Sequence, residues 1–303
     1  MALTIDWAAR TSALASALVA SALAGGAAAG SRTVPEPPED VGDIIAVGHR
    51  GTTKFAPENT LAAHDIAVAM GARVIEIDVR MTVDGHFVVM HDARVDRTTD
   101  GSGRVDQMAL AEIKRLDAGA WFAPEFAGER VPTLREALRN LRGRAGVDID
   151  FKSGPANSGA LLANILDQEG YADGPLVTVF ARAHAYNRLK GVSPRYALRP
   201  HFVSRRIAAA VAAGDGITIM GLRRWSFSFE SARAIRDNGM LLFSNVMGWA
   251  DGARGFADSI EAGAKFIQTD KLDELVAYLD GRGLLSTCVP ARDLSCWTRA
   301  PGL

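Results

Sequence analysis

The fold is decided around residues 74–92, which read VIEIDVRMTVDGHFVVMHD. Two apolar, β-branched runs flank Asp84-Gly85, a dipeptide typical of two-residue β-hairpins. A parallel crossover would need a dozen or more residues, which this segment does not have. Counting outward from a two-residue turn places Asp78 opposite His91 across the ladder, with Glu76 on the same face as Asp78. We therefore expect local structure to bring two acids and a histidine together.

Strand and helix patterns alternate on both sides of this hairpin, from Ile44 to about Leu279. Such alternation predicts a parallel sheet covered by helices, either a closed barrel or an open doubly wound sheet. The barrel is favoured because candidate site residues follow several separate strands, and because no Gly-x-Gly-x-x-Gly turn follows the first strand. We predict an α/β fold, a (β/α)8 TIM barrel of eight or nine strands whose second and third strands form the hairpin. The stretch 194–221 is the least defined.

A capping box marks one helix start within this pattern. Thr133 is followed three residues later by Glu136, a pairing that satisfies two backbone N–H groups at a helix start. We expect a helix to begin at Leu134.

Four segments divide the chain. They are a leader at 1–30, a proline-containing linker at 31–42, a barrel domain at 43–282 with an insertion at 93–130 after the third strand, and a C-terminal tail at 283–303. The leader has a long uncharged run and a small-residue stretch at Ala27-Ala28-Ala29, as secretory signals have, but lacks a clearly basic start. We expect a periplasmic or secreted protein, with a disordered leader on a cytoplasmic protein as the alternative.

The two cysteines, Cys288 and Cys296, lie in the tail and form neither a zinc motif nor a disulfide framework. They could pair in an exported protein and would be thiols in a cytosolic one.

Composition narrows the classes of partner. The chain has 303 residues, with 34 Lys plus Arg against 35 Asp plus Glu, for a net charge of −1. A near-neutral chain has no field to hold a nucleic acid or an anionic membrane, so we expect a small-molecule substrate instead. Glycines interrupt the apolar leader, so no stable membrane span is expected. The oligomeric state stays open.

Three acids suggest a metal site. Glu76 and Asp78 point to one face of a strand and repel each other unless a cation or proton lies between them. Asp150, on another predicted strand, completes an all-oxygen set suited to a hard cation such as Mg²⁺ or Ca²⁺. For the first two acids alone, a solvated strand face is the ordinary interpretation.

Basic residues and histidines accompany these acids. His49 and Arg50 follow an apolar strand, and Lys152 points to the same side as Asp150. Together with His91 they supply the acid, base and charge clamp that displace an alcohol from phosphorus. The other histidines, His64, His86, His184 and His201, are expected to be structural or on the surface.

Ten short motifs then resemble one family, the glycerophosphodiester phosphodiesterases, over roughly residues 44–279. In the family's order they are HRG 49–51, PENT 57–60, EID 76–78, DG 84–85, HD 91–92, DRTT 96–99, LDAG 116–119, WF 121–122, VPTL 131–134 and TD 269–270. The resemblance implies a (β/α)8 barrel with one divalent cation, Mg²⁺ or Ca²⁺, with Mn²⁺ as a further option. It implies that His49 and His91 are the catalytic acid–base pair and that Glu76 and Asp78 bind the metal.

The resemblance also assigns supporting residues. Arg50 would contact the phosphate, and Glu58 and Asn59 would line the site or orient the first histidine. Two departures stand out. The third metal ligand, usually Glu in a Glu-x-Lys motif, is the shorter Asp150. Asn245 occupies the place where many members have a Trp, so the alcohol held there need not be plain glycerol.

These observations predict an enzyme, a metal-dependent phosphodiesterase that releases sn-glycerol 3-phosphate and an alcohol. We expect His91 to be the base and His49 the acid, with the reverse and a cyclic phosphate intermediate left open. A lysophospholipase D-like activity is the first alternative, and its groove could include Trp121, Phe122, Phe126 and Trp249, although these aromatics are first expected in the core. A non-catalytic metal-binding barrel is the second.

Overall fold

The structure, a computed structural model, describes residues 42–152, 157–171, 177–181, 197–199 and 219–288. The predicted leader at 1–30, His184, His201 and Cys296 therefore lie outside the described residues. The strands are β1 (Ile45–Gly48), β2 (Val74–Met81), β3 (Phe87–Val89), β4 (Gly146–Phe151), β5 (Val177–Ala181), β6 (Ala197–Arg199), β7 (Ile219–Arg223), β8 (Leu241–Asn245) and β9 (Ala264–Thr269). The α-helices are α2 (Leu61–Ala69), α3 (Leu110–Ile113), α4 (Leu134–Leu141), α5 (Ser158–Gln168), α8 (Phe229–Arg236), α9 (Ala253–Glu261) and α10 (Leu272–Asp280).

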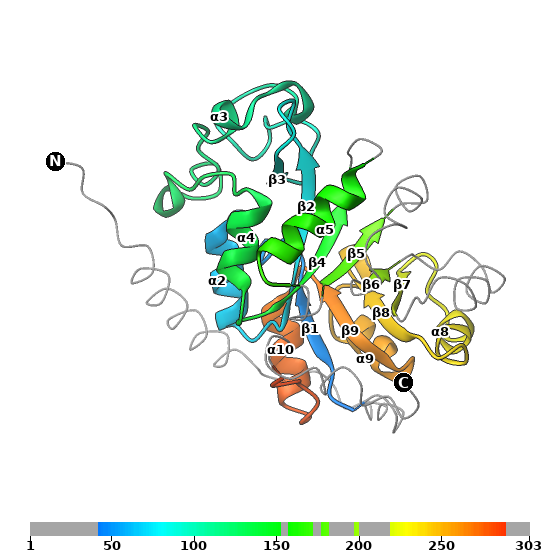
Figure 1. Cartoon of the computed structure of the whole chain (residues 1–303). Helices are drawn as coiled ribbons and strands as arrows, with labels where there is room; N and C mark the ends of the chain where they lie inside the picture. The colour runs from blue at the N-terminus through cyan, green and yellow to red at the C-terminus, as the bar shows by residue number, and fades with distance from the viewer. Residues whose placement is uncertain (1–41, 153–156, 172–176, 182–196, 200–218, 289–303) are drawn as a thin grey trace.

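Eight of these strands form the predicted barrel. Their order is β6-β5-β4-β2-β1-β9-β8-β7, and each ladder between neighbours is parallel. The two ends of this order, β6 and β7, lie next to each other, so the sheet curls round on itself. Helices lie outside the strands (Figure 1). The α/β barrel prediction is confirmed, and β6 falls in the stretch that the sequence left undefined.

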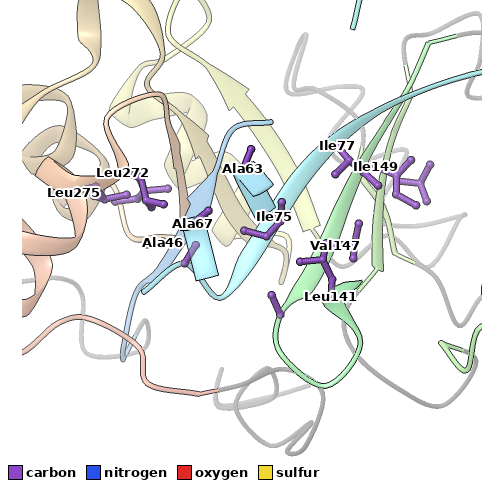
Figure 2. Close-up of a cluster of buried hydrophobic side chains, with 14 of the residues drawn as sticks. Ala46, Ala63, Ala67, Ile75, Ile77, Leu141, Val147, Ile149, Leu272 and Leu275 are labelled. Atoms are coloured by element: carbon purple, nitrogen blue, oxygen red, sulfur yellow. The ribbon is translucent and has the colours of Figure 1, made fainter. Parts of the chain in front are cut away.

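Side chains alternate between the two faces of each strand and so contribute to two separate apolar cores. Val47, Phe243 and Phe266 belong to a small apolar cluster contributed by strands alone, which fills the barrel interior near the amino ends of the strands. The intervening residues, such as Ile75 and Ile77, face the helices and pack into the large core between strands and helices (Figure 2). On β2 the inward positions after Val74 are polar, so the polar site lies inside the barrel beyond the apolar cluster.

The hairpin of β2 and β3 differs from the prediction by one residue. Val79 pairs with Val89 and Met81 with Phe87, so Asp78 faces Met90 and not His91. The reason is a three-residue loop, in which Gly85 has a φ of +83°. Such a loop ends in a left-handed residue, and it shifts the register from that of a two-residue turn.

Side-chain caps start the helices that pack against β2 and β4. The Thr133 hydroxyl accepts from the N–H of Glu136, whose carboxylate accepts from the Thr133 N–H, so the predicted capping box is confirmed. Thr60 caps α2 in the same way by accepting from Ala63. These caps fix where each helix begins relative to the preceding loop.

Residues 93–130 contribute no strand to the barrel. They hold α3 and two short 3₁₀ turns beside β3, and Val95, Val105 and Ile113 pack into a separate apolar cluster with Val88 and Met90. This segment therefore has a small core of its own at the edge of the site.

The end of the described chain packs against its start. The N–H of Ile44 donates to the Leu284 carbonyl at 2.7 Å, and the Ser286 N–H donates to the Ile44 carbonyl at 2.9 Å. Cys288, further along, is disulfide-bonded. No helix among the described residues combines the length and apolar character that a bilayer-crossing segment needs.

Candidate active site

Three carboxylates meet inside the barrel, as predicted. Glu76 and Asp78 are alternate residues of β2, and Asp78 lies beside Asp150 in the β2–β4 ladder. One carboxylate oxygen from each lies within 4.8 Å of the others. Burial and the nearby charges of Asp78 and Asp150 raise the pKa of Glu76 well above its usual range.

This triad fits a hard divalent cation. The Asp150 Oδ1 is buried and has no hydrogen-bond partner among the residues that the structure describes. Lys152 offsets part of the negative charge, with its Nζ 2.5 Å from Asp150 Oδ2 and 2.8 Å from Asp78 Oδ1. An oxygen-only donor set of this kind suits Mg²⁺, Ca²⁺ or Mn²⁺. The shorter Asp150 therefore still reaches the triad.

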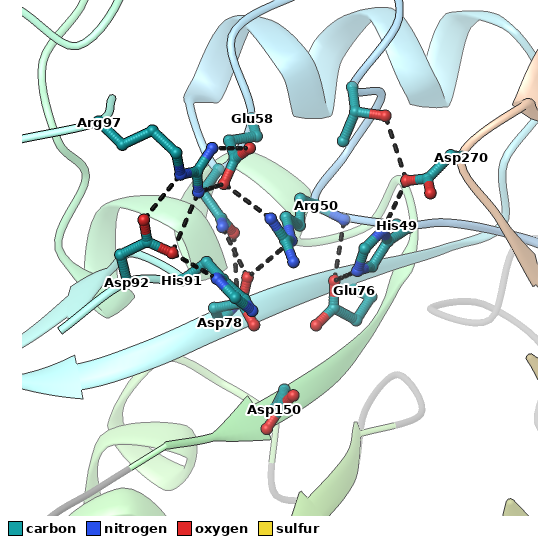
Figure 3. A network of polar contacts seen from close by, with 12 residues as sticks. His49, Arg50, Glu58, Glu76, Asp78, His91, Asp92, Arg97, Asp150 and Asp270 are labelled. Carbon is teal, nitrogen blue, oxygen red and sulfur yellow. Dashed lines mark hydrogen bonds and ion pairs between the residues drawn. The ribbon is translucent and has the colours of Figure 1, made fainter. Parts of the chain in front are cut away.

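His49 follows β1 and is fixed by an aspartate that the sequence analysis had not assigned. Its Nδ1 lies 2.6 Å from Asp270 Oδ1, just after β9, while its Nε2 is 3.9 Å from Glu76 Oε2 (Figure 3). Burial opposes ionisation of Asp270, but the hydrogen bond to His49 prevails and lowers the pKa of Asp270. Asp270 is held in turn by its own N–H, which donates to Asp251 Oδ2 at 2.8 Å. This network occupies Nδ1 and leaves Nε2 facing Glu76.

His91 is held in the same way by the next residue. Its Nδ1 lies 2.6 Å from Asp92 Oδ1, and the Arg97 guanidinium binds both Asp92 and Glu58 (Figure 3). The hydrogen bond from Arg97 holds the pKa of Asp92 far below its usual range. Burial lowers the pKa of His91, although Asp78 and Asp92 oppose this shift. A neutral imidazole is therefore favoured at His91.

Arg50 occupies an unusual backbone conformation between these groups. Its φ is +53°, its N–H donates to Glu76, and its Nε lies 3.2 Å from Asp78 Oδ2. Gly51 follows with a φ of +84°, and a Cβ there would lie 2.7 Å from the Ala63 carbonyl carbon in α2. The glycine of this motif thus allows α2 to approach the loop closely.

Glu58 and Asn59 act through other residues. Glu58 accepts from Arg50 at 2.9 Å and from Arg97, and Asn59 donates to Asp78 Oδ2 at 2.8 Å while accepting from the Asp78 N–H. Within the part of the chain that the structure describes, neither residue lines the main cavity and neither has a hydrogen bond to His49. They line a smaller pocket together with His91 and bind Arg50 and Asp78, whereas His49 is bound by Asp270.

The two histidines open onto one cavity of about 270 Å³ at the carboxyl ends of the strands. Glu76, Asp150 and the predicted phosphate contacts line it on one side, and Asn245 at the end of β8 lines it on another. The Asn245 side chain donates to Gln268 Oε1 at 3.2 Å. The cavity is lined by His49, Arg50, Glu76, His91, Asp150, Lys152, Arg199, Arg223, Arg224, Trp225, Asn245, Met247, Gly248 and Gln268.

A buried ion pair contributes one of the residues that line this cavity. No sequence motif predicted this pair. Arg199 of β6 binds both carboxylate oxygens of Asp148 of β4, at 2.6 and 3.1 Å, and its guanidinium lies 3.9 Å from the Phe243 ring centre. By contrast, the motifs that contain Asp92, Arg97 and Asp270 were visible in the sequence. Only the roles of these three were missed.

The aromatic residues considered for a lipid groove separate into two places. Trp121, Phe122 and Phe126 pack edge to face in the inserted segment, and Phe126 is buried. Trp249 is 80% exposed and lines a second groove next to the main cavity, so the expectation that it belongs to the core is wrong.

Known proteins share both sequence and fold with this chain. A profile of the Glycerophosphoryl diester phosphodiesterase family matches residues 49–162. The glycerophosphodiester phosphodiesterase of Caldanaerobacter subterraneus is 50% identical over 111 residues, 36% of this chain and 46% of that protein. The chain thus spans less than half of the length of the curated relatives matched first.

Solved structures cover more of the chain. The crystal structure of glycerophosphodiester phosphodiesterase from Agrobacterium tumefaciens is 32% identical with a TM-score of 0.66, and the match covers 77% of this chain and 99% of that one. A phosphodiesterase from Oleispira antarctica, solved in complex with the product sn-glycerol-3-phosphate, is 25% identical with a TM-score of 0.69, over 78% of this chain and 97% of that one. With the motifs and the barrel already in place, these matches show that the chain belongs to the glycerophosphodiester phosphodiesterase family.

Proposed function

We propose that the protein hydrolyses glycerophosphodiesters to sn-glycerol 3-phosphate and an alcohol. The observation that carries this proposal is the pair of histidines in one cavity, each bound at Nδ1 by an aspartate. Such binding orients Nε2 of both His49 and His91 and fixes their tautomers. Two oriented imidazoles suit a reaction in which one proton is removed and another is delivered.

His91 is the base in this proposal, because the lowered pKa keeps its imidazole neutral. Its Nε2 accepts the proton of the nucleophile, whose oxygen forms the new bond to phosphorus. The nucleophile is water, or a neighbouring hydroxyl of the substrate that forms a cyclic phosphate, which water then opens. His49 is the acid, and its Nε2 donates a proton to the departing alcohol oxygen. The Asp270 carboxylate, 2.6 Å from Nδ1 of His49, keeps the ring oriented for this transfer.

The phosphate is bound by cationic side chains. Arg50 and Lys152 both line the cavity and lie within ion-pair distance of the carboxylate triad. Their charges compensate the phosphodiester, which would otherwise be repelled by three acids. Asn59 keeps Asp78 in position for this arrangement.

Glu76, Asp78 and Asp150 would hold the divalent cation. When bound, it supplies Lewis-acid stabilisation of charge on the phosphate oxygens. The product bound in the Oleispira antarctica structure, sn-glycerol-3-phosphate, supports the choice of substrate class for this chain.

The test measures release of sn-glycerol 3-phosphate from glycerophosphocholine and glycerophosphoethanolamine with Mg²⁺, Ca²⁺, Mn²⁺ or EDTA. We expect cation-dependent release that His49→Ala reduces by about a thousandfold or more. His86→Ala, in the exposed hairpin loop, is the matched control and should retain activity.

Choline release from lysophosphatidylcholine together with inert glycerophosphocholine would replace this proposal by a lysophospholipase D-like activity. Cation binding without turnover of either class would favour the non-catalytic barrel.

A further inference from the structure

Arg224 lines the cavity and is held in place by surrounding residues. It directly follows β7, and its guanidinium lies 4.8 Å from the Trp225 ring centre and 5.8 Å from that of Trp249. It also donates to the Met247 carbonyl at 3.3 Å. The two tryptophans are 71% and 80% exposed, which is unusual for such large apolar side chains. Their position is explained if they hold this guanidinium.

Gly248 makes room for the same side chain. Its φ is +77°, and a Cβ at this position would lie 2.1 Å from Arg224 Nη1. A larger residue would therefore displace the guanidinium. The glycine in the loop after β8 thus leaves the space that the Arg224 guanidinium occupies.

The charge of Arg224 is not neutralised by a carboxylate of the described residues. Among the described residues, its guanidinium has ring contacts with the two tryptophans and a hydrogen bond to one carbonyl, whereas Arg199 on the neighbouring strand is paired with Asp148. Arg224 is half-buried and lines both the main cavity and the second groove. An accessible, oriented guanidinium of this kind suits a carboxylate or a phosphate.

The topology places this charge across the barrel from the metal ligands. β7 is four positions away from β2 in the strand order in either direction, so the two strands lie on opposite sides of the barrel. The carboxylates of β2 mark where the reacting phosphate would lie. A group bound by Arg224 therefore belongs to the far end of the same ligand.

We propose that Arg224 forms a subsite for a second anionic group, a carboxylate or phosphate carried by the alcohol part of the diester. This deepens, and rests on, the proposed function. A cationic alcohol such as choline is disfavoured, because the place between Trp225 and Trp249 that would receive a cation is already taken by Arg224. Asn245, beside it, offers an uncharged hydrogen-bonding group to the same part of the substrate.

The test uses binding, so that it does not depend on turnover. Alkanediol bisphosphates with three to six carbons and the matching alkyl monophosphates are titrated by calorimetry into the full chain in Mg²⁺. We expect the best bisphosphate to bind about tenfold or more tightly than its monophosphate, as a charge-assisted hydrogen bond allows. Alkyl phosphates ending in a carboxylate distinguish the two kinds of anion.

Variants connect this difference to the subsite. Arg224→Ala and Gly248→Ala should bring the affinity ratio close to one, and Arg224→Lys should restore part of it. Arg233→Ala, on the exposed face of α8, removes the same charge outside the cavity and should keep the ratio. Equal affinities in the wild type, or a ratio that Arg224→Ala leaves unchanged, would overturn the proposal.

Measurements of turnover distinguish failure of the subsite proposal from failure of the proposed function. Glycerophosphoglycolate should be cleaved with a higher kcat/KM than glycerophosphoethanolamine, and Arg224→Ala should reduce this preference about tenfold. Tight bisphosphate binding through Arg224 with no hydrolysis of any diester would refute the proposed function alone. Hydrolysis without an Arg224-dependent preference would refute the subsite alone.

Discussion

The orientation of His49 depends on one oxygen of Asp270. The Asp270 carboxylate accepts a hydrogen bond from Nδ1–H at 2.6 Å, and the Thr53 hydroxyl donates to the same oxygen at 3.2 Å. A carboxamide at this position presents an N–H as readily as an oxygen. It would then stabilise the opposite tautomer, with the proton on Nε2.

We therefore predict that Asp270→Asn lowers kcat by about a hundredfold or more, with a much smaller change in KM. Asp273→Asn, which removes the same charge from the partner of Lys54 in the first turn of α10, should keep kcat within about threefold. Equal losses in the two variants would mean that Asp270 has only a structural role.

At the scale of elements, α2 contains a buried titratable group that serves no chemical role. His64 is completely buried, and neither of its ring nitrogens has a hydrogen-bond partner among the described residues. Burial lowers the pKa of His64 to about 4. The unfolded chain binds a proton near pH 6.5, so the unfolded state takes up the proton first as the pH falls.

This shift predicts a pH-dependent loss of stability. Above pH 6.5 His64 is neutral in both states and makes the stability no more pH-dependent. Between pH 6.5 and 4 its contribution to the free energy of unfolding should fall by about 3 kcal/mol. Urea unfolding of the wild type and of His64→Leu at pH 7.5 and pH 4.5 measures this term as the difference between the two proteins. Parallel pH dependence in both would contradict it.

Elements also show how far local sequence determines structure. The capping box at Thr133 was predictable because both partners lie within one helical turn. The hairpin register was not, because Asp84-Gly85 fits a two-residue turn and also the three-residue loop that the structure has. His91 still reaches the cavity, because β3 ends at Val89 and the chain then leaves the ladder.

At the scale of the molecule, the carboxylate triad should couple cation binding to folding. Three acids that converge only in the folded barrel bind a divalent ion far better than the unfolded chain does. A cation at about a hundred times its Kd adds about 2.7 kcal/mol to the free energy of unfolding.

We predict that Mg²⁺ at such a concentration raises Tm by about 5 °C, measured by differential scanning fluorimetry against choline chloride of equal ionic strength. Glu76→Gln should remove this increase because it removes a ligand. Glu125→Gln, at an exposed position of the inserted segment, should leave it intact. An increase that persists in Glu76→Gln would mean that the ion binds elsewhere.

The arrangement of the strands in the whole barrel explains which residues of the site could be predicted from the sequence. Glu76, Asp78, His49 and His91 sit in short motifs, and a parallel barrel brings the ends of all its strands to one face. Asp148 and Arg199 are 51 positions apart in the sequence, and neither residue lies in a motif that indicates its partner. Their pairing depends on how β4, β5 and β6 are aligned, which local patterns do not define.

The pairing of Ile44 with Leu284 and Ser286 has a practical consequence. The chain enters β1 and passes beyond α10 at one point, on the face of the barrel that carries the amino ends of the strands. The cavity opens on the other face. A surface tether or a fused protein attached near this point would hold the molecule with its cavity turned toward the solution, and a circular permutant that joins these two segments would have a short gap to bridge.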